Sequence, residues 1–242
     1  MTYALYSELT AWYHLVDPAP DHADEAACYE AAFARGIQGP ARTLLDLGSG
    51  AGNNASHLKR RFACTLADLS PAMLDLSRAR NPECEHVVGD LRTLRLGRTF
   101  DAVLLHDAVS YMTTEPDLRA AIETAWVHTR PGGAAIVTAD VLADSFAERT
   151  DPLDGDDGVR ALRGVMWQWD PDPDDTTYRV DFAFLLRERG DVRLVHDSHV
   201  EGMFARSTWI RLLTETGFAV EGVPRPIDEH ETDEIFLCRR GV

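Results

Sequence analysis

The sequence predicts an α/β fold in which a doubly wound, mostly parallel seven-stranded sheet carries a small antiparallel β insertion. Three observations support this fold class. Short, continuously apolar runs alternate with helical patterns, a glycine-rich turn follows the first run, and after residue 140 the runs become alternately apolar and polar. Continuous runs are typical of parallel strands buried on both faces, whereas alternation is typical of antiparallel strands with one wet face.

The parallel sheet and its helices follow in order along the chain. The predicted strands are residues 43–47, 64–67, 86–88, 100–105, 134–138, 218–223 and 235–238. A helix is expected over residues 54–62, and Ser70 with Pro71 suits the N-cap and first position of the next one. A third helix follows Pro116 and ends before Pro131. The last covers residues 207–216, and Gly217 ends it.

The segments outside this sheet are expected to form a cap. In the insertion, strands are predicted at residues 162–169, 178–187 and 192–203, preceded by an acidic loop at 151–158. Tyr6 and Tyr13 fall on one helical face, which predicts a helix that either closes as a lid or is simply docked on the core. The predicted divisions are an N-terminal helical lid (1–36), the core (37–140), the insertion (141–203) and the completion of the sheet (204–242).

Composition and charge exclude several classes of protein. Lys plus Arg number 24 against 40 Asp plus Glu, a net charge of −16, so nucleic acid and membranes are not expected partners. The sequence contains no signal-peptide pattern and no apolar run that approaches a membrane span, so we expect a cytoplasmic protein.

No metal site is predicted. The four cysteines form no C-x-x-C pair. Residues 170–175 imitate a calcium loop but lack its glycine and contain two prolines, so we expect an exposed acidic hairpin. His196 and His199 have an odd spacing, which sends them to opposite faces of a strand.

The most informative segment is the glycine turn after the first strand. Glycines at positions 48, 50 and 52 let the backbone approach a ligand and aim the amides of the next helix at it. Asn53 stands where a dinucleotide motif needs its third glycine, which argues against NAD. Asp68 ends the second strand, where a carboxylate can accept both ribose hydroxyls of a nucleoside. Asp90 follows the third strand at the same edge.

Five ordered motifs resemble those of the class I S-adenosylmethionine-dependent methyltransferases, which have a Rossmann-like fold. They are Asp46-Leu-Gly-Ser-Gly-Ala-Gly52, Asp68-Leu-Ser-Pro-Ala-Met-Leu74, Gly89-Asp90, Phe100-Asp101-Ala-Val and Arg130-Pro-Gly-Gly133. They cover residues 40 to 140, and residues 209–218 are also similar to that family. The insertion and the tyrosine-rich start resemble small-molecule members, including relatives of glycine N-methyltransferase and amino-sugar N-methyltransferases.

The resemblance implies a cofactor and its contacts. The cofactor is S-adenosyl-L-methionine, and the product is S-adenosyl-L-homocysteine. The glycine turn then lies beside the methionine part, the acid matching Asp68 binds ribose, and the acid matching Asp90 binds the adenine amine. The predicted cofactor contacts are Tyr6, Tyr13, Asp46, Gly48, Gly50, Gly52, Asp68, Leu69, Met73, Gly89, Asp90, Leu91 and His106.

Methyl transfer from a sulfonium requires alignment and exclusion of water, and needs a base only if the nucleophile arrives protonated. His106, Asp107 and His199 are the candidate catalytic groups. The candidate substrate contacts are Tyr111, Asp140, Trp167, His199 and Glu201. The alternatives are that His106 contacts the cofactor or is structural, that His199 and Glu201 form a charge pair on a wet strand face, and that Trp167 packs the insertion.

The predicted function is methyl transfer from S-adenosylmethionine to a nitrogen or oxygen of a small molecule. The alternative is a non-catalytic protein that binds S-adenosylmethionine or another nucleoside in a regulatory or scaffolding role. The insertion is also a candidate interface for a homodimer.

Overall fold

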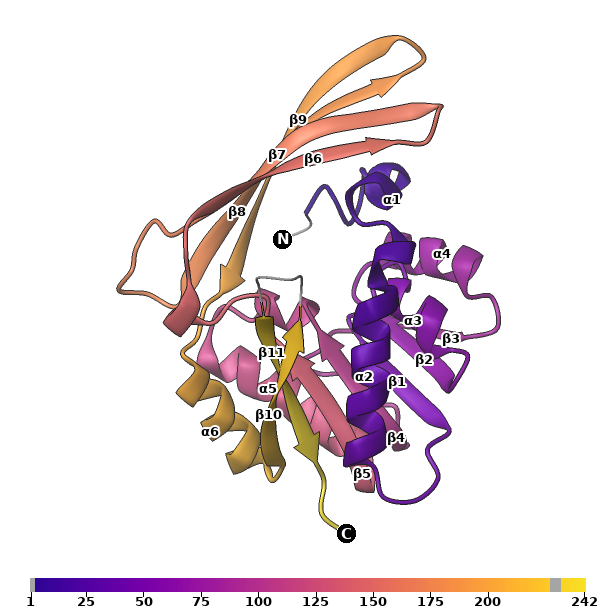
Figure 1. Cartoon of the computed structure of the whole chain (residues 1–242), viewed down its shortest axis with the longest axis vertical. Helices are drawn as coiled ribbons and strands as arrows, with labels where there is room; N and C mark the ends of the chain where they lie inside the picture. The colour runs from indigo at the N-terminus through magenta and orange to yellow at the C-terminus, as the bar shows by residue number, and fades with distance from the viewer. Residues whose placement is uncertain (1–2, 227–231) are drawn as a thin grey trace.

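A computed structural model describes residues 3–226 and 232–242 (Figure 1). Its larger sheet has seven strands in the order β10-β11-β5-β4-β1-β2-β3. The strands are β1 (Thr43–Leu47), β2 (Ala63–Asp68), β3 (Glu85–Val88), β4 (Phe100–His106), β5 (Thr129–Thr138), β10 (Ala219–Pro226) and β11 (Thr232–Arg239). The pairs among β1 to β5 are parallel, and β11 is antiparallel to both neighbours. The predicted fold class is confirmed.

Helices cover both faces of this sheet. One hydrophobic cluster joins the sheet to α2 (Ala23–Gly36) and α3 (Asn53–Leu58). A second joins the opposite face to α5 (Glu115–His128) and α6 (Arg206–Thr216), while α4 (Pro71–Arg80) packs along β2 and β3. As predicted, the Ser70 hydroxyl caps α4 by accepting the Met73 N–H at 3.2 Å, and Gly217 ends α6 with a φ of 116°.

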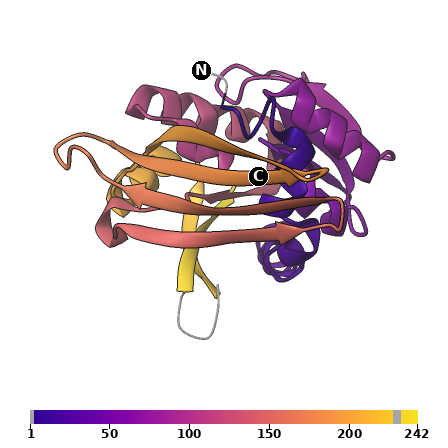
Figure 2. The same ribbon diagram turned by 90° about the horizontal axis from the view of Figure 1, so that it is seen from above.

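A separate four-stranded antiparallel sheet lies over the carboxyl edge of the larger sheet (Figures 1 and 2). Its strands are β6 (Arg149–Asp156), β7 (Arg160–Trp169), β8 (Thr177–Glu188) and β9 (Asp191–Gly202). The prediction that residues 151–158 form a loop is wrong, because most of them belong to β6. This strand lies at the sheet edge, the part of a sheet in which proline is tolerated. A Cβ on Gly155 would lie 2.5 Å from the carbonyl oxygen of Leu15.

The predicted N-terminal helix through Tyr6 and Tyr13 is also wrong. The segment folds into turns, a 3-10 helix (Thr10–Trp12) and the short α1 (Tyr13–Val16), and a second 3-10 helix (Ala19–His22) leads into α2. Tertiary packing decides its shape, because its apolar side chains fill the inner face of the antiparallel sheet. The third hydrophobic cluster contains Leu5, Leu9, Trp12, Leu162, Tyr178, Val180, Phe182, Phe184, Leu186 and Met203.

This arrangement defines where a ligand can meet the chain. The carboxyl ends of β1, β2, β4 and β5 point toward the inner face of β8 and β9, and the N-terminal segment runs between them (Figure 1). In open α/β sheets, ligands bind outside the carboxyl ends of the strands. None of the helices described in residues 3–226 and 232–242 has the length and apolar composition that a membrane crossing demands.

Candidate functional site

The turn after β1 is tight enough to require glycine. Gly48 has a φ of +81°, and its N–H donates to the carbonyl of Ala67 at 2.7 Å. A Cβ at position 48 would overlap the Cβ of Ala108. Gly52 adopts a left-handed conformation as the N-cap of α3. The turn is therefore held close to the end of β4, with α3 starting directly behind it.

The predicted ribose-binding acid lies against this turn. Asp68 accepts the N–H of Gly50 at 2.8 Å and the N–H of Ser70 at 2.7 Å. Burial raises its pKa, although these two amides act in the opposite direction. Leu69 beside it is 65% exposed, whereas Met73 is buried. A carboxylate next to an uncovered apolar side chain suits a nucleoside, which has both polar hydroxyls and an apolar base.

The other predicted cofactor contacts surround the same edge. Gly89 donates to the carbonyl of Asp68 at 3.0 Å, and the buried Leu91 follows β3. Asp90 accepts the Arg92 guanidinium at 2.7 Å, which lowers the pKa of the carboxyl. Asp46 is buried in β1 under the turn, and burial raises its pKa to about 7.

His106, at the end of β4, is held between two carboxylates. Its Nε2 lies 3.0 Å from Glu25 and 2.6 Å from Asp107. Burial alone would lower the pKa of His106, but these carboxylates outweigh it and raise the pKa to about 10. The raised pKa favours the imidazolium over the neutral imidazole that a general base requires, so this pairing does not favour the expected general-base role, which stays a prediction. The contact of His106 with the cofactor also stays a prediction.

Asp107 and Asp140 form a carboxyl pair beside His106. Asp107 has a φ of +51°, a conformation that few residues other than glycine adopt, and its side chain is 50% exposed. The two carboxyl groups share a hydrogen bond. Burial raises the pKa of Asp140, reinforced by the Asp107 carboxylate, whereas the His106 imidazolium lowers that of Asp107 against the effect of burial. The pair therefore favours one negative charge over two, with a proton held more strongly on Asp140 than on Asp107.

His199 and Glu201 lie on the inner face of β9. They are only 1% and 6% exposed, so the alternative of a wet strand face is wrong. His199 Nδ1 bonds the Tyr111 hydroxyl at 2.8 Å, Nε2 contacts Asp197 at 3.1 Å, and the Tyr3 ring stacks on it at 4.1 Å. The prediction that His199 touches substrate is therefore wrong, since both nitrogens are engaged and its ring is covered. It positions Tyr111.

Hydroxyl groups of tyrosine and serine extend the hydrogen bonds of His199 toward Ser70, which lies near Asp68. Tyr111 and Tyr6 share a hydrogen bond of 2.8 Å, and the backbone carbonyl of Tyr6 accepts the Ser70 hydroxyl at 2.6 Å. Tyr13 donates to Asp17 at 2.7 Å, and its ring lies 6.3 Å from that of Tyr6. Although Tyr6 and Tyr13 do not share a helix, the structure brings Tyr13 beside the glycine turn and Tyr6 beside Tyr111.

Trp167 is not part of this site. It lies on the outer face of the antiparallel sheet, 41% exposed, and stacks on Trp169 with ring centres 5.1 Å apart. The prediction that it contacts substrate is wrong, because its position in β7 points it away from the face that carries His199. The alternative that it packs within the insertion is correct.

Sequence analysis missed the residue that ties these parts together, Glu25 on α2. Its side chain meets His22 at 3.1 Å, Asn54 at 2.8 Å, and also His106 and Arg225. Burial would raise the pKa of Glu25, but its bonds to the histidines outweigh burial and lower it. No motif marks Glu25, because all of these partners except His22 come from distant parts of the chain. Arg80 was missed for the same reason.

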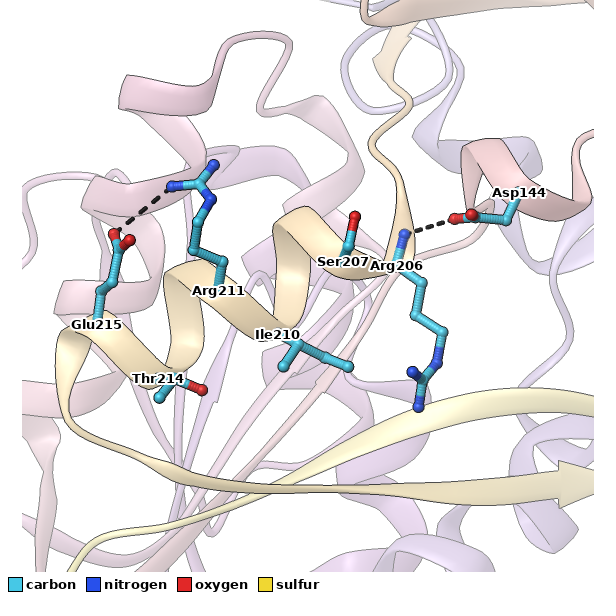
Figure 3. Close-up of a pocket in the computed structure, with 7 residues that line it drawn as sticks. All are labelled: Asp144, Arg206, Ser207, Ile210, Arg211, Thr214 and Glu215. Atoms are coloured by element: carbon cyan, nitrogen blue, oxygen red, sulfur yellow. Dashed lines mark hydrogen bonds and ion pairs between the residues drawn. The ribbon is translucent and has the colours of Figure 1, made fainter.

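A surface hollow lies on α6, away from the glycine turn (Figures 1 and 3). Asp144 caps this helix by accepting the Arg206 N–H at 2.6 Å, and the Arg211 guanidinium lies 3.5 Å from Glu215. Arg206 also pairs with Glu234 at 2.5 Å. The charges of this hollow are thus paired among themselves, and it shares no residue with the candidate site.

Comparisons with known proteins agree with this geometry. Residues 44–133 match the family described as methyltransferase domain. The chain is 30% identical over 209 residues to the dTDP-3-amino-3,4,6-trideoxy-alpha-D-glucopyranose N,N-dimethyltransferase of Streptomyces venezuelae, a match that covers 83% of this chain and 85% of that protein.

Two solved structures are similar over almost the whole chain. The crystal structure of Streptomyces venezuelae DesVI has a TM-score of 0.81, 23% identity and coverage of 98% of each chain. CalS10 from Micromonospora echinaspora, an amino pentose methyltransferase solved with its S-adenosylmethionine bound, has a TM-score of 0.76, 25% identity and coverage of 99% and 98%. The fold resemblance therefore extends through the antiparallel sheet.

Fold and site together define a nucleoside-binding α/β transferase. This chain belongs to the class I S-adenosylmethionine-dependent methyltransferases. It is an enzyme that uses S-adenosylmethionine to methylate a small molecule, and the regulatory alternative gains no support. The residues fit this cofactor: the turn admits no side chain at position 48, the Ser49 hydroxyl is buried without a partner among the described residues, and Asp68 is beside it.

Proposed function

We propose that this enzyme methylates the amino group of an amino sugar. The observation that carries the proposal is the accessible Asp107–Asp140 carboxyl pair at the carboxyl ends of β4 and β5. Carboxylates attract a protonated amine. An ammonium group can lose a proton to a carboxylate, whereas a hydroxyl acceptor would usually need a histidine as its base; His106 Nε2 lies between two carboxylates and His199 has both nitrogens engaged.

The proposed steps use this pair. The acceptor binds as an ammonium ion beside Asp107 and gives one N–H proton to that carboxylate. When bound, S-adenosylmethionine supplies a methyl group already activated by the sulfonium. The freed lone pair on nitrogen forms the new C–N bond while the methyl–sulfur bond breaks, and the electrons of that bond stay on sulfur. Tyr111, fixed by His199 and Tyr6, borders the acceptor, and the antiparallel sheet limits access of water.

The likeness to sugar N,N-dimethyltransferases supports a direct test. The purified enzyme is incubated with S-adenosylmethionine and either dTDP-3-amino-3,6-dideoxyglucose or dTDP-6-deoxyglucose, and products are measured by mass spectrometry. A relative from Streptomyces fradiae is named for the amino compound. We expect methylation of the amino sugar alone. Methylation of the hydroxyl compound would contradict the choice of nitrogen, and binding of S-adenosylmethionine without turnover on any amine would favour the regulatory alternative.

For the cofactor, we propose that Asp68 binds the ribose hydroxyls and that the exposed Leu69 packs on the adenine ring. Replacement of Asp68 by Ala is expected to raise the Kd for S-adenosylhomocysteine by about 10- to 100-fold, because charge-assisted hydrogen bonds are lost. Calorimetric titration measures this change. Replacement of the exposed Asp75 on α4 by Ala is the matched control and should leave the Kd unchanged. Unchanged affinity in the Asp68 variant would show that the ribose assignment is wrong.

We also infer that the outer face of the antiparallel sheet pairs with a second copy of the chain. This face exposes five large apolar side chains, Val165, Trp167, Leu185, Val192 and Leu194, and such patches mark interaction surfaces. Sedimentation should detect a dimer that Leu194→Glu dissociates. The same change at Val127, which is exposed on α5, should have no effect. A wild-type chain that stays monomeric at all concentrations would contradict the inference.

A further inference from the structure

Arg80, the last residue of α4, reaches back to the glycine turn. Its Nη1 donates to the carbonyl of Ala51 at 2.8 Å and also to the side-chain oxygen of Asn53. Asn81, which follows it, donates to the carbonyl of Gly52 at 2.9 Å. The end of α4 is thus packed on the turn, and the guanidinium is fixed beside it.

Asp17 attracts the Arg80 guanidinium only across the Asn53 side chain, whose amide donates to the Asp17 carboxylate at 2.8 Å. Within residues 3–226 and 232–242 Arg80 makes no ion pair, and both of its acceptors are neutral. Two nearby arginines differ in this respect: Arg78 pairs with Asp75 at 2.7 Å, and Arg160 pairs with Glu188 at 2.9 Å. A guanidinium has five N–H donors, and the structure gives partners only to Nη1. Nε and Nη2 are therefore left to bind an anion.

Arg80 and Tyr13 line the same surface hollow. It is formed by the N-terminal segment, α4 and Arg160, and Tyr13 lies on its wall. The Tyr13 hydroxyl is 4.0 Å from the position that a Cβ on Gly50 would take. Tyr13 therefore neighbours both the glycine turn and the hollow that Arg80 lines.

We propose that Arg80 binds the carboxylate of the methionine half of S-adenosylmethionine. A carboxylate matches the planar fork of an arginine, which can donate two parallel hydrogen bonds. The proposal rests on the placement of the cofactor along the glycine turn given above. It adds a residue outside the glycine turn and the acids at the strand ends, and it makes the end of α4 part of the binding site.

The test compares two ligands that differ only in this carboxylate. S-adenosylhomocysteine and its decarboxylated analogue, S-adenosyl-3-thiopropylamine, are titrated calorimetrically into the wild type and into Arg80→Ala. The wild type should prefer S-adenosylhomocysteine by about 10- to 100-fold, and Arg80→Ala should bind both ligands with nearly equal affinity. Arg80→Lys, which keeps the charge but not the fork, should give an intermediate preference. Arg78→Ala should retain the full preference.

Three results would overturn the proposal. A wild type that binds both ligands equally does not recognise the carboxylate. An Arg80→Ala variant that weakens both ligands by the same factor would limit Arg80 to shaping the turn through Ala51 and Asn53. Absence of binding to either ligand in the wild type would overturn the placement of the cofactor as well. That last outcome distinguishes a wrong placement of the cofactor from a correctly placed cofactor whose carboxylate does not contact Arg80.

Discussion

Replacement of Asp107 by Asn is expected to lower kcat by about 100- to 10,000-fold, the range that proton transfer contributes in enzymes. Asn keeps the size and branching of the side chain that already adopts a φ of +51° at this position, so we expect the backbone to stay unchanged. It cannot accept the proton of an ammonium group, and it leaves the His106 imidazolium with one carboxylate fewer. Steady-state kinetics with the amino sugar acceptor measure the loss.

The Kd for S-adenosylhomocysteine separates catalysis from cofactor binding in this variant. We expect the Kd to stay within about threefold of wild type, less than one hydrogen bond to a charged group is worth. Asp24→Asn, an exposed change on α2, is the control for the loss of a negative charge. Wild-type kcat in Asp107→Asn would eliminate Asp107 as the proton acceptor. An increase in Kd equal to the loss in kcat would instead assign Asp107 to cofactor binding.

Replacement of Gly48 by Ala is expected to destabilise the protein by about 2–5 kcal/mol. A left-handed conformation costs a non-glycine residue about 1–2 kcal/mol, and overpacking adds about 1–3 kcal/mol. The added methyl group would overlap the Cβ of Ala108 and push apart the turn and the end of β4. Thermal unfolding should therefore show a Tm lower by about 5–15 °C, and calorimetry should detect no binding of S-adenosylhomocysteine.

Gly39→Ala separates the cost of the left-handed backbone from the cost of the overlap with Ala108. Gly39 has the same φ of +81°, but no atom lies within 4 Å of its would-be Cβ. This variant should lose only the conformational part of the stability and should bind the ligand normally. Equal Tm losses in the two variants would show that Ala108 moves aside without cost, contrary to the close approach that the structure describes.

Sequence reasoning succeeded where the chemistry is local. The run from Asp46 to Gly52 predicts a strand followed by a tight turn, because each of its glycines meets a backbone requirement within a few residues. Ser70 and Pro71 predict the start of α4 in the same way, through an N-cap that the next turn of helix satisfies. In β8, strict alternation from Tyr178 onward predicts which face is buried.

Sequence reasoning failed where a distant partner decides the structure. The N-terminal segment has a helical pattern, but packing of Leu5 and Leu9 against the antiparallel sheet overrides it. Residues of β6 appear loop-like, because an edge strand accommodates Pro152 and acidic residues that a central strand would not. The role of His106 depends on Glu25, which lies far away in the sequence and belongs to no motif.

Hydrogen bonds through Tyr6 link the residues proposed to bind the cofactor with those proposed to border the acceptor. Ser70, next to the proposed ribose acid, bonds the backbone of Tyr6, whose hydroxyl meets Tyr111 and thereby His199. One short segment is thus held in place from the donor side and from the acceptor side. Ordering it for one ligand lowers the entropic cost of binding the other. By thermodynamic linkage such an enhancement is reciprocal, so we expect the methyl donor and the acceptor to raise each other's affinity by the same factor.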